Sequence, residues 1–358
     1  MIKCPLTGSL HTKIIYEQEA VPLIQNKVYP TAEQARNALC KRVVIAQSLE
    51  NGFVFSADFT DSIIDYDMHY QNEQSNSAYF RKHLEHVIDI MNNNQTLDGK
   101  VVEIGCGKAY FMDMLLQKGV DVIGFDPTYE GSSTKVVKDF FSDKYSNVGA
   151  EFIILRHTLE HISQPFHFIK TIAAANNHKG KIYIEVPTFE WILEHNAVED
   201  IFYEHCNYFT LDTLQMFFSK SVGGHFFNGQ YIYVIADLAD VKKEIVPRTI
   251  VPYNVNFKNR LIEYATKINR AGSLAIWGAG AKGSTFLNLE DKECKKIKIV
   301  IDINPKKQHQ FVGGTGHYII KPEELPGYGI DHVVVMNINY IDEIKLVTEP
   351  LHINLITL

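Results

Sequence analysis

Apolar residues along the chain recur with the spacings of helices and strands. Over residues 79–91 they follow one face of a helix, and a turn at Asp98-Gly99 then leads into the first strand-like run. Four such runs, separated by helical or mixed stretches, cover residues 100–104, 121–125, 151–155 and 181–186. This rhythm is typical of a parallel α/β sheet, which we expect within residues 66–240.

The same pattern restarts after a connector. Residues 237–253 carry alternating charges and two prolines, as linkers between domains do. Apolar runs and a small-residue turn then cover residues 273–277, 278–283, 297–301 and 332–336. We therefore predict an α/β protein in three parts: a small module over residues 1–65, a central Rossmann-like domain over residues 66–240, and a C-terminal Rossmann-like domain over residues 254–358.

Composition narrows the function classes. The formal charge of −7 argues against a broad nucleic-acid face, because proteins that bind phosphate backbones cluster Lys and Arg. No apolar run reaches the roughly 18–20 residues that span a bilayer, and no leader pattern opens the sequence, so we expect a cytoplasmic protein without membrane contact. The five cysteines include no Cys-x-x-Cys pair, which predicts neither a disulfide framework nor an obvious zinc site.

A glycine-rich loop follows the first strand-like run. At Gly105 and Gly107 the absence of a Cβ atom lets the backbone turn sharply and approach a ligand. About 20 residues further on, Asp126 and Pro127 end the next strand, and the Asp126 carboxylate is placed to accept hydrogen bonds from ribose hydroxyls. The unit predicts an adenosine site.

The sequence of the loop separates two cofactors. It reads Glu-x-Gly-x-Gly and lacks the third glycine of dinucleotide-binding loops. Glu103 would repel a pyrophosphate but suits the cationic methionine part of S-adenosylmethionine. We therefore predict S-adenosylmethionine as the cofactor rather than NAD, and a class I methyltransferase domain over residues 66–240.

Other segments are candidates for the same site. His157 follows the third strand-like run, at the sheet edge where ligands bind, whereas Glu160 and His161 either begin a helix or contact the cofactor. Asp139 and Phe140 either pack locally or contact the adenine.

Residues 66–75 combine tyrosines with amide and hydroxyl groups, which suits a lid over a polar ligand better than a purely apolar contact. We assign Tyr66, Gln74 and Ser75 to the cofactor, and Tyr70 and Asn72 to the substrate.

Proton-transfer groups are dense over residues 202–210. Histidine titrates near neutral pH and is the commonest general base, which makes His205 the best candidate for that role. Glu204 and Tyr203 stand beside it in the sequence and could orient it or stabilise charge. The alternative is a surface cluster without chemistry.

Taken together, these segments resemble the nucleotide-sugar C-methyltransferases of antibiotic deoxysugar biosynthesis, the family typified by the tylosin mycarose C-3 methyltransferase. The resemblance covers nearly the whole chain and rests on residues 66–75, 103–107, 157–161, 185–187, 204–209, 277–283, 302–307 and 337–340. It implies a small N-terminal zinc-binding module, a methyltransferase domain and a C-terminal domain that helps to hold the nucleotide sugar.

The resemblance also implies a reaction. In that family the C3 proton of a 4-keto hexose is removed, and the resulting enolate attacks the methyl group. On this basis His205 is the base and Glu204 supports the site. The nucleotide-sugar contacts fall on Gly278, Gly280, Lys282 and Asn288.

The sequence departs from the family pattern twice. Phe202 stands where the family has a catalytic tyrosine, so either Tyr203 takes over the hydroxyl role or the substrate differs. Of the family's two Cys-x-x-Cys pairs only Cys4 and Cys40 remain, and a structural zinc needs four ligands. We therefore expect no bound metal, and a module held by packing against the methyltransferase domain.

Three functions stay open on the sequence. The first is C-methylation of a nucleotide-linked keto-deoxysugar, and the second is O- or N-methylation of a related sugar or small polar metabolite. The third is a nucleotide-sugar-binding protein or NAD-dependent oxidoreductase that uses the loop at residues 278–283. We expect a monomer or homodimer with a small-molecule substrate and no nucleic-acid partner.

Overall fold

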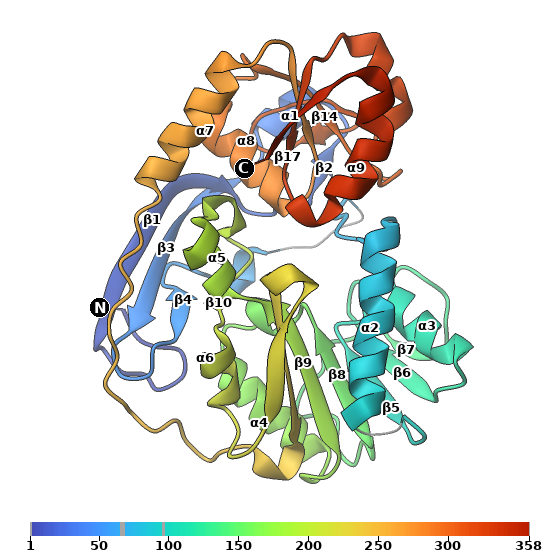
Figure 1. The fold of residues 1–358 in the computed structure, drawn as a ribbon. Helices are drawn as coiled ribbons and strands as arrows, with labels where there is room; N and C mark the ends of the chain where they lie inside the picture. The colour runs from blue at the N-terminus through green and yellow to red at the C-terminus, as the bar shows by residue number, and fades with distance from the viewer. Residues whose placement is uncertain (1, 65–68, 95–96, 358) are drawn as a thin grey trace.

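The computed structural model describes residues 2–64, 69–94 and 97–357. Figure 1 shows a lower body built on one large sheet, an upper body built on a second sheet, and N-terminal strands beside both. Tyr66, a predicted cofactor contact, lies outside the described residues.

Seven strands form the central sheet, in the order β11-β12-β9-β8-β5-β6-β7. Strands β5 to β9 are parallel, whereas β12 runs antiparallel to both β9 and β11. They are β5 (Val101–Ile104), β6 (Val122–Phe125), β7 (Val136–Val137), β8 (Phe152–Arg156), β9 (Lys181–Pro187), β11 (Val222–Phe226) and β12 (Tyr231–Asp237). The first strand of a doubly wound sheet lies at its centre, where ligand sites form, and the expected α/β fold is confirmed.

Helices and short turns connect these strands. The predicted helix over 79–91 is α2 (Ala78–Asn94), whose buried face packs in one core cluster with residues of β5, β6 and β8. The other helices of this body are α3 (Tyr110–Gln117), α4 (Pro165–Ala175), α5 (Phe189–His195) and α6 (Leu211–Gln215). Turns of 3-10 helix lie at Leu159–His161, Val198–Asp200, Phe227–Gly229 and Leu238–Asp240.

The upper body is a five-stranded parallel sheet in the order β16-β14-β13-β17-β18. Its strands are β13 (Leu274–Trp277), β14 (Ile297–Ile301), β16 (Ile319–Ile320), β17 (His332–Val335) and β18 (Asn354–Thr357). Its helices are α7 (Lys258–Arg270), α8 (Ala281–Glu290) and α9 (Ile341–Thr348), with 3-10 turns at Pro322–Tyr328, Ile338–Tyr340 and Glu349–Leu351. The expected C-terminal Rossmann-like fold is therefore present.

The N-terminal strands are joined to both bodies. β1 (Thr12–Pro22), β3 (Cys40–Ser48) and β4 (Val54–Ser56) form an antiparallel sheet whose fourth strand is β10 (Asn207–Tyr208). β2 (Val28–Tyr29) pairs with β15 (Phe311–Val312) of the upper body. Two short helical segments, α1 (Ala32–Arg36) and a 3-10 turn at Asp61–Ile63, complete this part. The segment thus packs on both sheets rather than on the central one alone.

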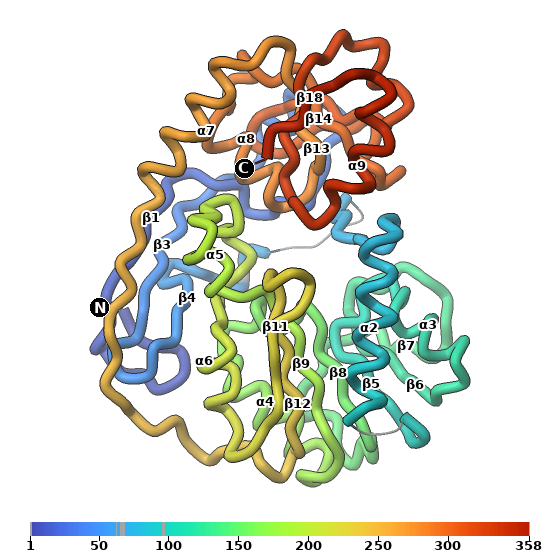
Figure 2. The backbone as a smooth tube through the Cα atoms, in the orientation of Figure 1, coloured from blue at the N-terminus to red at the C-terminus, as the bar shows by residue number. Residues whose placement is uncertain are grey.

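The predicted connector crosses the molecule without an α-helix. Figure 2 shows it running from the end of the central sheet along the N-terminal strands to α7. Its Arg248 N–H donates to the carbonyl of Glu50 at 2.6 Å, and its Tyr253 N–H donates to Gln47 Oε1 at 2.8 Å. These bonds attach the connector to β3 and the turn that follows it.

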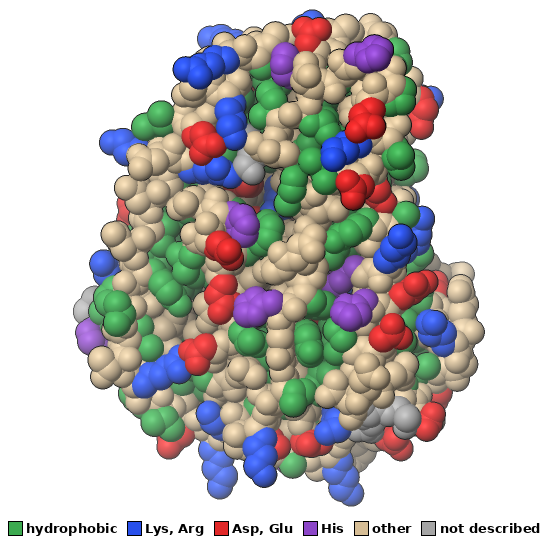
Figure 3. Space-filling view, in the orientation of Figure 1, with side chains coloured by type: hydrophobic (Ala, Val, Ile, Leu, Met, Phe, Trp, Pro, Cys, Tyr) green, Lys and Arg blue, Asp and Glu red, His purple; other side chains and the backbone are tan. Residues whose placement is uncertain are grey.

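Two surface properties bear on partners. Among the described residues, none of the helices is both long and apolar enough to cross a membrane. On the face shown in Figure 3, acidic and basic side chains are interspersed.

Candidate active site

A cavity of about 460 Å³ lies between the two bodies. Its wall is formed by loops at the carboxyl ends of parallel strands in both sheets, where ligands of such folds bind. The predicted site residues that line it are Tyr70, Asn72, Gln74, Glu103, Gly105, Gly107, His157, Glu204, His205, Gly278, Gly280 and Lys282. The cavity therefore brings together side chains that lie far apart in the sequence.

The glycine-rich loop is fastened to the end of the next strand. Gly105 has φ +79°, and a Cβ there would lie 2.2 Å from Thr158 Oγ1, so only glycine fits. Asp126 Oδ2 accepts a hydrogen bond from the Gly107 N–H at 2.8 Å, and Oδ1 accepts from the N–H and hydroxyl of Thr128. Asp126 thus shapes the loop, which sequence reasoning had not foreseen, and it is not among the cavity-lining residues.

Glu103 is the buried acid beneath this loop. It is 2% exposed, and its Oε2 has no hydrogen-bond partner among the described residues. Burial raises the pKa of its carboxyl to about 7. A carboxylate in this state gains stability from a cationic ligand, which fits the ammonium or sulfonium of S-adenosylmethionine.

A charged network lies behind the cavity wall and centres on Glu185. This fully buried carboxylate accepts hydrogen bonds from Arg156 at 2.7 and 3.3 Å and from His83 at 2.9 Å. His157 Nε2 lies 3.0 Å from the same carboxylate. The positive charge of Arg156, together with His83 and His157, outweighs burial and holds the pKa of Glu185 well below its usual range.

His157 and Arg156 are the members of this network that line the cavity. His157 has φ +48°, in the left-handed region, and its Nδ1 lies 3.6 Å from Glu160 Oε1. Burial alone would lower the pKa of His157, but the carboxylates of Glu160 and Glu185 raise it by more, to about 9. His157 is therefore a cation at neutral pH, fixed between two carboxylates.

His205 faces the cavity from the segment before β10. It forms no hydrogen bond with a described residue, and its ring packs 4.3 Å from that of Phe202 and 4.8 Å from that of His161. Burial, aided by the neighbouring His161 and His157, holds its pKa well below the usual range. The imidazole is therefore neutral and able to accept a proton.

The neighbours of His205 have structural partners. Glu204 Oε2 accepts a hydrogen bond from the Gln25 N–H at 2.8 Å, so this carboxylate holds a turn of the N-terminal segment. Tyr203 is buried away from the cavity, where its hydroxyl accepts from the Thr60 N–H at 3.1 Å. The structure does not bring Tyr203 to the position that a substitute for the family tyrosine would need.

The loop after β13 forms the opposite wall. The Ala279 N–H donates to Asp302 Oδ2 at 2.8 Å, and the Lys282 ammonium donates to Asp200 at 2.6 Å. Lys307, which sequence reasoning missed, is buried beside this loop and donates to Asn26 Oδ1 at 3.1 Å and to the Ala279 carbonyl at 3.0 Å. The charge of Lys282 is therefore already balanced inside the protein.

Several predicted site residues lie outside the cavity lining. Asn288 donates to carbonyls of Ser284 and Gly313 and joins α8 to the following loop. Phe140 is 72% exposed, and Asp139 accepts a hydrogen bond from Tyr145. Pro127 and Ser75 also lie outside the lining, in addition to Asp126 and Tyr203 described above.

Comparison with known proteins gives two family matches. Residues 70–221 match a methyltransferase domain, and residues 254–351 match a C-methyltransferase C-terminal domain. The curated C-methyltransferase NovU of Streptomyces niveus is 24% identical over 318 residues, which covers 77% of this chain and 76% of that protein.

Solved structures similar to part of the chain include two archaeal proteins. A SAM-dependent methyltransferase from Archaeoglobus fulgidus is 16% identical, with a TM-score of 0.35, over 44% of this chain and 99% of that one. The PH0226 protein from Pyrococcus horikoshii OT3 is 13% identical, with a TM-score of 0.37, over 48% of this chain and 98% of that one.

Proposed function

We propose that this chain, an S-adenosylmethionine-dependent methyltransferase, methylates a carbon of a nucleotide-linked keto-deoxysugar, with His205 as the base. One observation carries the proposal. A single cavity joins the loop beside Glu103, the neutral imidazole of His205 and the glycine loop at residues 278–283. Such a cavity can hold a methyl donor, a base and a nucleotide together.

The base acts on a carbon acid. His205 takes the proton from the carbon next to the sugar carbonyl, and the electron pair of that C–H bond forms an enolate. S-adenosylmethionine, held beside Glu103, Gly105 and Gly107, would supply an electrophilic methyl group for the enolate carbon and would leave as the neutral thioether S-adenosylhomocysteine. The protein contributes the alignment of the two reactants and the exclusion of water.

The glycine loop after β13 supports a nucleotide substrate. Gly280 is the N-cap of α8, so the N–H groups of Ala281 and Lys282 in the first helical turn have no partner within the helix and can receive a diphosphate. Because Lys282 is paired with Asp200, we assign the phosphate contacts to these amides rather than to that ammonium.

One observation favours a second function, O-methylation of a related sugar. Phe202 occupies the position beside His205 and offers no hydroxyl to stabilise an enolate, and the Tyr203 hydroxyl bonds to backbone elsewhere. Methylation of a hydroxyl needs a base but no enolate. The two reactions differ in the atom that carries the new methyl group.

The test is to incubate the protein with nucleotide-linked 4-keto-6-deoxyhexoses in D₂O, with and without S-adenosylmethionine. The proposal expects exchange of the carbon-bound proton without the cofactor and a C-methylated product with it, both lost in His205→Ala. His86→Ala, an exposed histidine on α2, is the matched control. An O-methylated product without proton exchange would establish the second function, and full activity of His205→Ala would remove His205 as the base.

A further inference from the structure

We propose that Glu160, His161 and His205 form a binding site for a divalent transition-metal ion of the zinc and cobalt type, and that an ion bound there inhibits the enzyme by occupying the base. The inhibition rests on the function proposed above. The binding does not, because it depends only on the three side chains.

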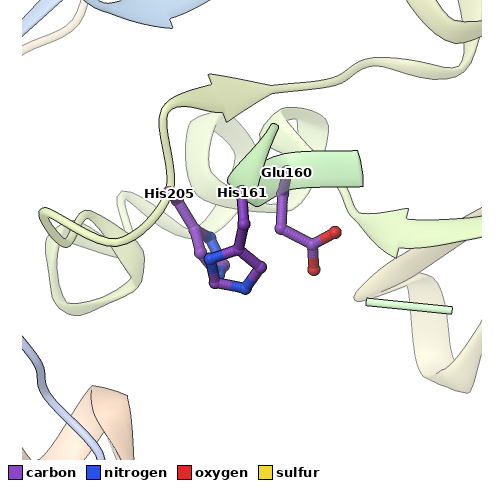
Figure 4. A group of neighbouring side chains, drawn as sticks. All are labelled: Glu160, His161 and His205. Carbon is purple, nitrogen blue, oxygen red and sulfur yellow. The ribbon is translucent and has the colours of Figure 1, made fainter. Parts of the chain in front are cut away.

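The three side chains converge from two segments that are bonded to each other. Glu160 and His161 lie in the 3-10 turn after β8, and the Cys206 N–H, next to His205, donates to the Glu160 carbonyl at 2.9 Å. One ligand atom from each side chain lies within 4.8 Å of the other two, and Figure 4 shows the side chains pointing to the same side of the chain. With metal–ligand distances of about 2.1 Å at tetrahedral angles, two ligand atoms lie roughly 3.4 Å apart. Rotation of the side chains can bring these three ligand atoms from their present separations to that distance.

Each of the three side chains has an acceptor atom that can coordinate a cation. His161 Nδ1–H donates to the Glu204 carbonyl at 2.9 Å, which fixes the tautomer and leaves the Nε2 lone pair available. His205 has no hydrogen-bond partner among the described residues, and its ring packs 4.8 Å from that of His161. Glu160 is 2% exposed, and its Oε2 also lacks a partner in the described part of the chain.

The ligand set selects the class of metal. Two imidazoles and one carboxylate suit zinc, cobalt, nickel or ferrous iron, whereas magnesium and calcium prefer oxygen ligands. Three protein ligands leave a position open for water, as in catalytic zinc sites, and all three residues line the cavity. Because a nitrogen that coordinates a metal cannot accept a proton, an ion at this site removes the base.

The binding test uses cobalt(II) and zinc(II) alone, added to the metal-free full-length protein. Cobalt should give visible absorption bands of a low-coordinate nitrogen and oxygen site, and zinc should displace it one for one in calorimetry. His161→Ala and Glu160→Gln should each weaken binding by more than the roughly 10–100-fold that loss of an outer-shell partner costs. The matched control is again His86→Ala. Equal affinity in all four proteins would overturn the site.

The inhibition test measures proton exchange in D₂O and adenosylhomocysteine affinity as zinc is raised. Relative to the metal-free rate of each protein, we expect exchange to fall with zinc occupancy in the parent protein and to fall much less in His161→Ala, which keeps His205 but loses one metal ligand. Zinc should change the adenosylhomocysteine affinity of each protein by less than twofold. That affinity also shows that the variants are folded. Metal binding without loss of exchange would refute the inhibition, whereas absence of exchange in the metal-free parent would refute the proposed function instead.

Discussion

The buried Glu103 predicts that cofactor affinity depends on pH in a calculable way. Burial raises its pKa to about 7 from 4.5, so the free protein at pH 7 carries this carboxyl about half protonated. If the ammonium of bound adenosylhomocysteine restores the ordinary pKa, the shift of about 2.5 units corresponds to about 3 kcal/mol in favour of the ionised form. By linkage, binding then releases about half a proton at pH 7.

The size of the effect follows from the same two pKa values. Affinity for adenosylhomocysteine should rise about 15-fold between pH 5.5 and pH 7, because the protonated fraction of the free protein falls over that range. Glu103→Gln mimics the protonated acid, so its affinity should be nearly independent of pH, about 10-fold weaker than the parent at pH 5.5 and about 150-fold weaker at pH 7.

Calorimetry measures both quantities. Titrations at several pH values give the affinities, and repetition in buffers with different ionisation enthalpies gives the number of protons released. A parent and a Glu103→Gln protein with parallel pH profiles would show that Glu103 does not face the cationic part of the cofactor, and the assignment of this residue would fail.

Three further predictions concern the framework of the site. Glu185→Gln leaves a buried guanidinium without its carboxylate and should lower the free energy of unfolding by about 3–5 kcal/mol in urea titrations, whereas Asp121→Asn in an exposed pair should change it little. Because the pKa of His157 is raised in the folded state, protonated His157 stabilises the fold fully below about pH 6.5, and this contribution is lost as the pH rises through about 9. If the free energy of unfolding of His157→Gln fell equally steeply with pH, this prediction would be wrong. Gly105→Ala places a Cβ against Thr158 at a positive φ and should abolish adenosylhomocysteine binding in calorimetry, and unchanged affinity would show that the loop can move.

Local patterns were sufficient to predict the framework. Strands that are buried on both faces read as apolar runs, and the runs at 100–104 and 181–186 became β5 and β9 within one residue at each end. Residues placed just after such strands, among them Gly105, Gly107 and His157, line the cavity because the carboxyl ends of parallel strands meet at one edge.

What the sequence could not supply is the pairing of distant residues. His83 reaches Glu185 from α2, 102 positions away, and Glu204 meets Gln25 across 179 positions. Such contacts depend on the tertiary packing of elements that are distant in the sequence, for which no local spacing is diagnostic. Even for neighbouring residues, the sequence does not tell which side chain faces the cavity. Phe202 lines the cavity, whereas the Tyr203 hydroxyl bonds to the Thr60 N–H.

Contacts between residues distant in the sequence also hold the N-terminal segment in place. Here β10 extends the N-terminal sheet and β15 pairs with β2, so backbone hydrogen bonds to both bodies restrict the segment. Its turn at Gln25 and Asn26 then bonds to Glu204 on one side and Lys307 on the other. The segment therefore couples the residue beside the proposed base to the wall that faces the nucleotide, and the two halves of the cavity are positioned by a part of the chain that contributes few groups to its lining.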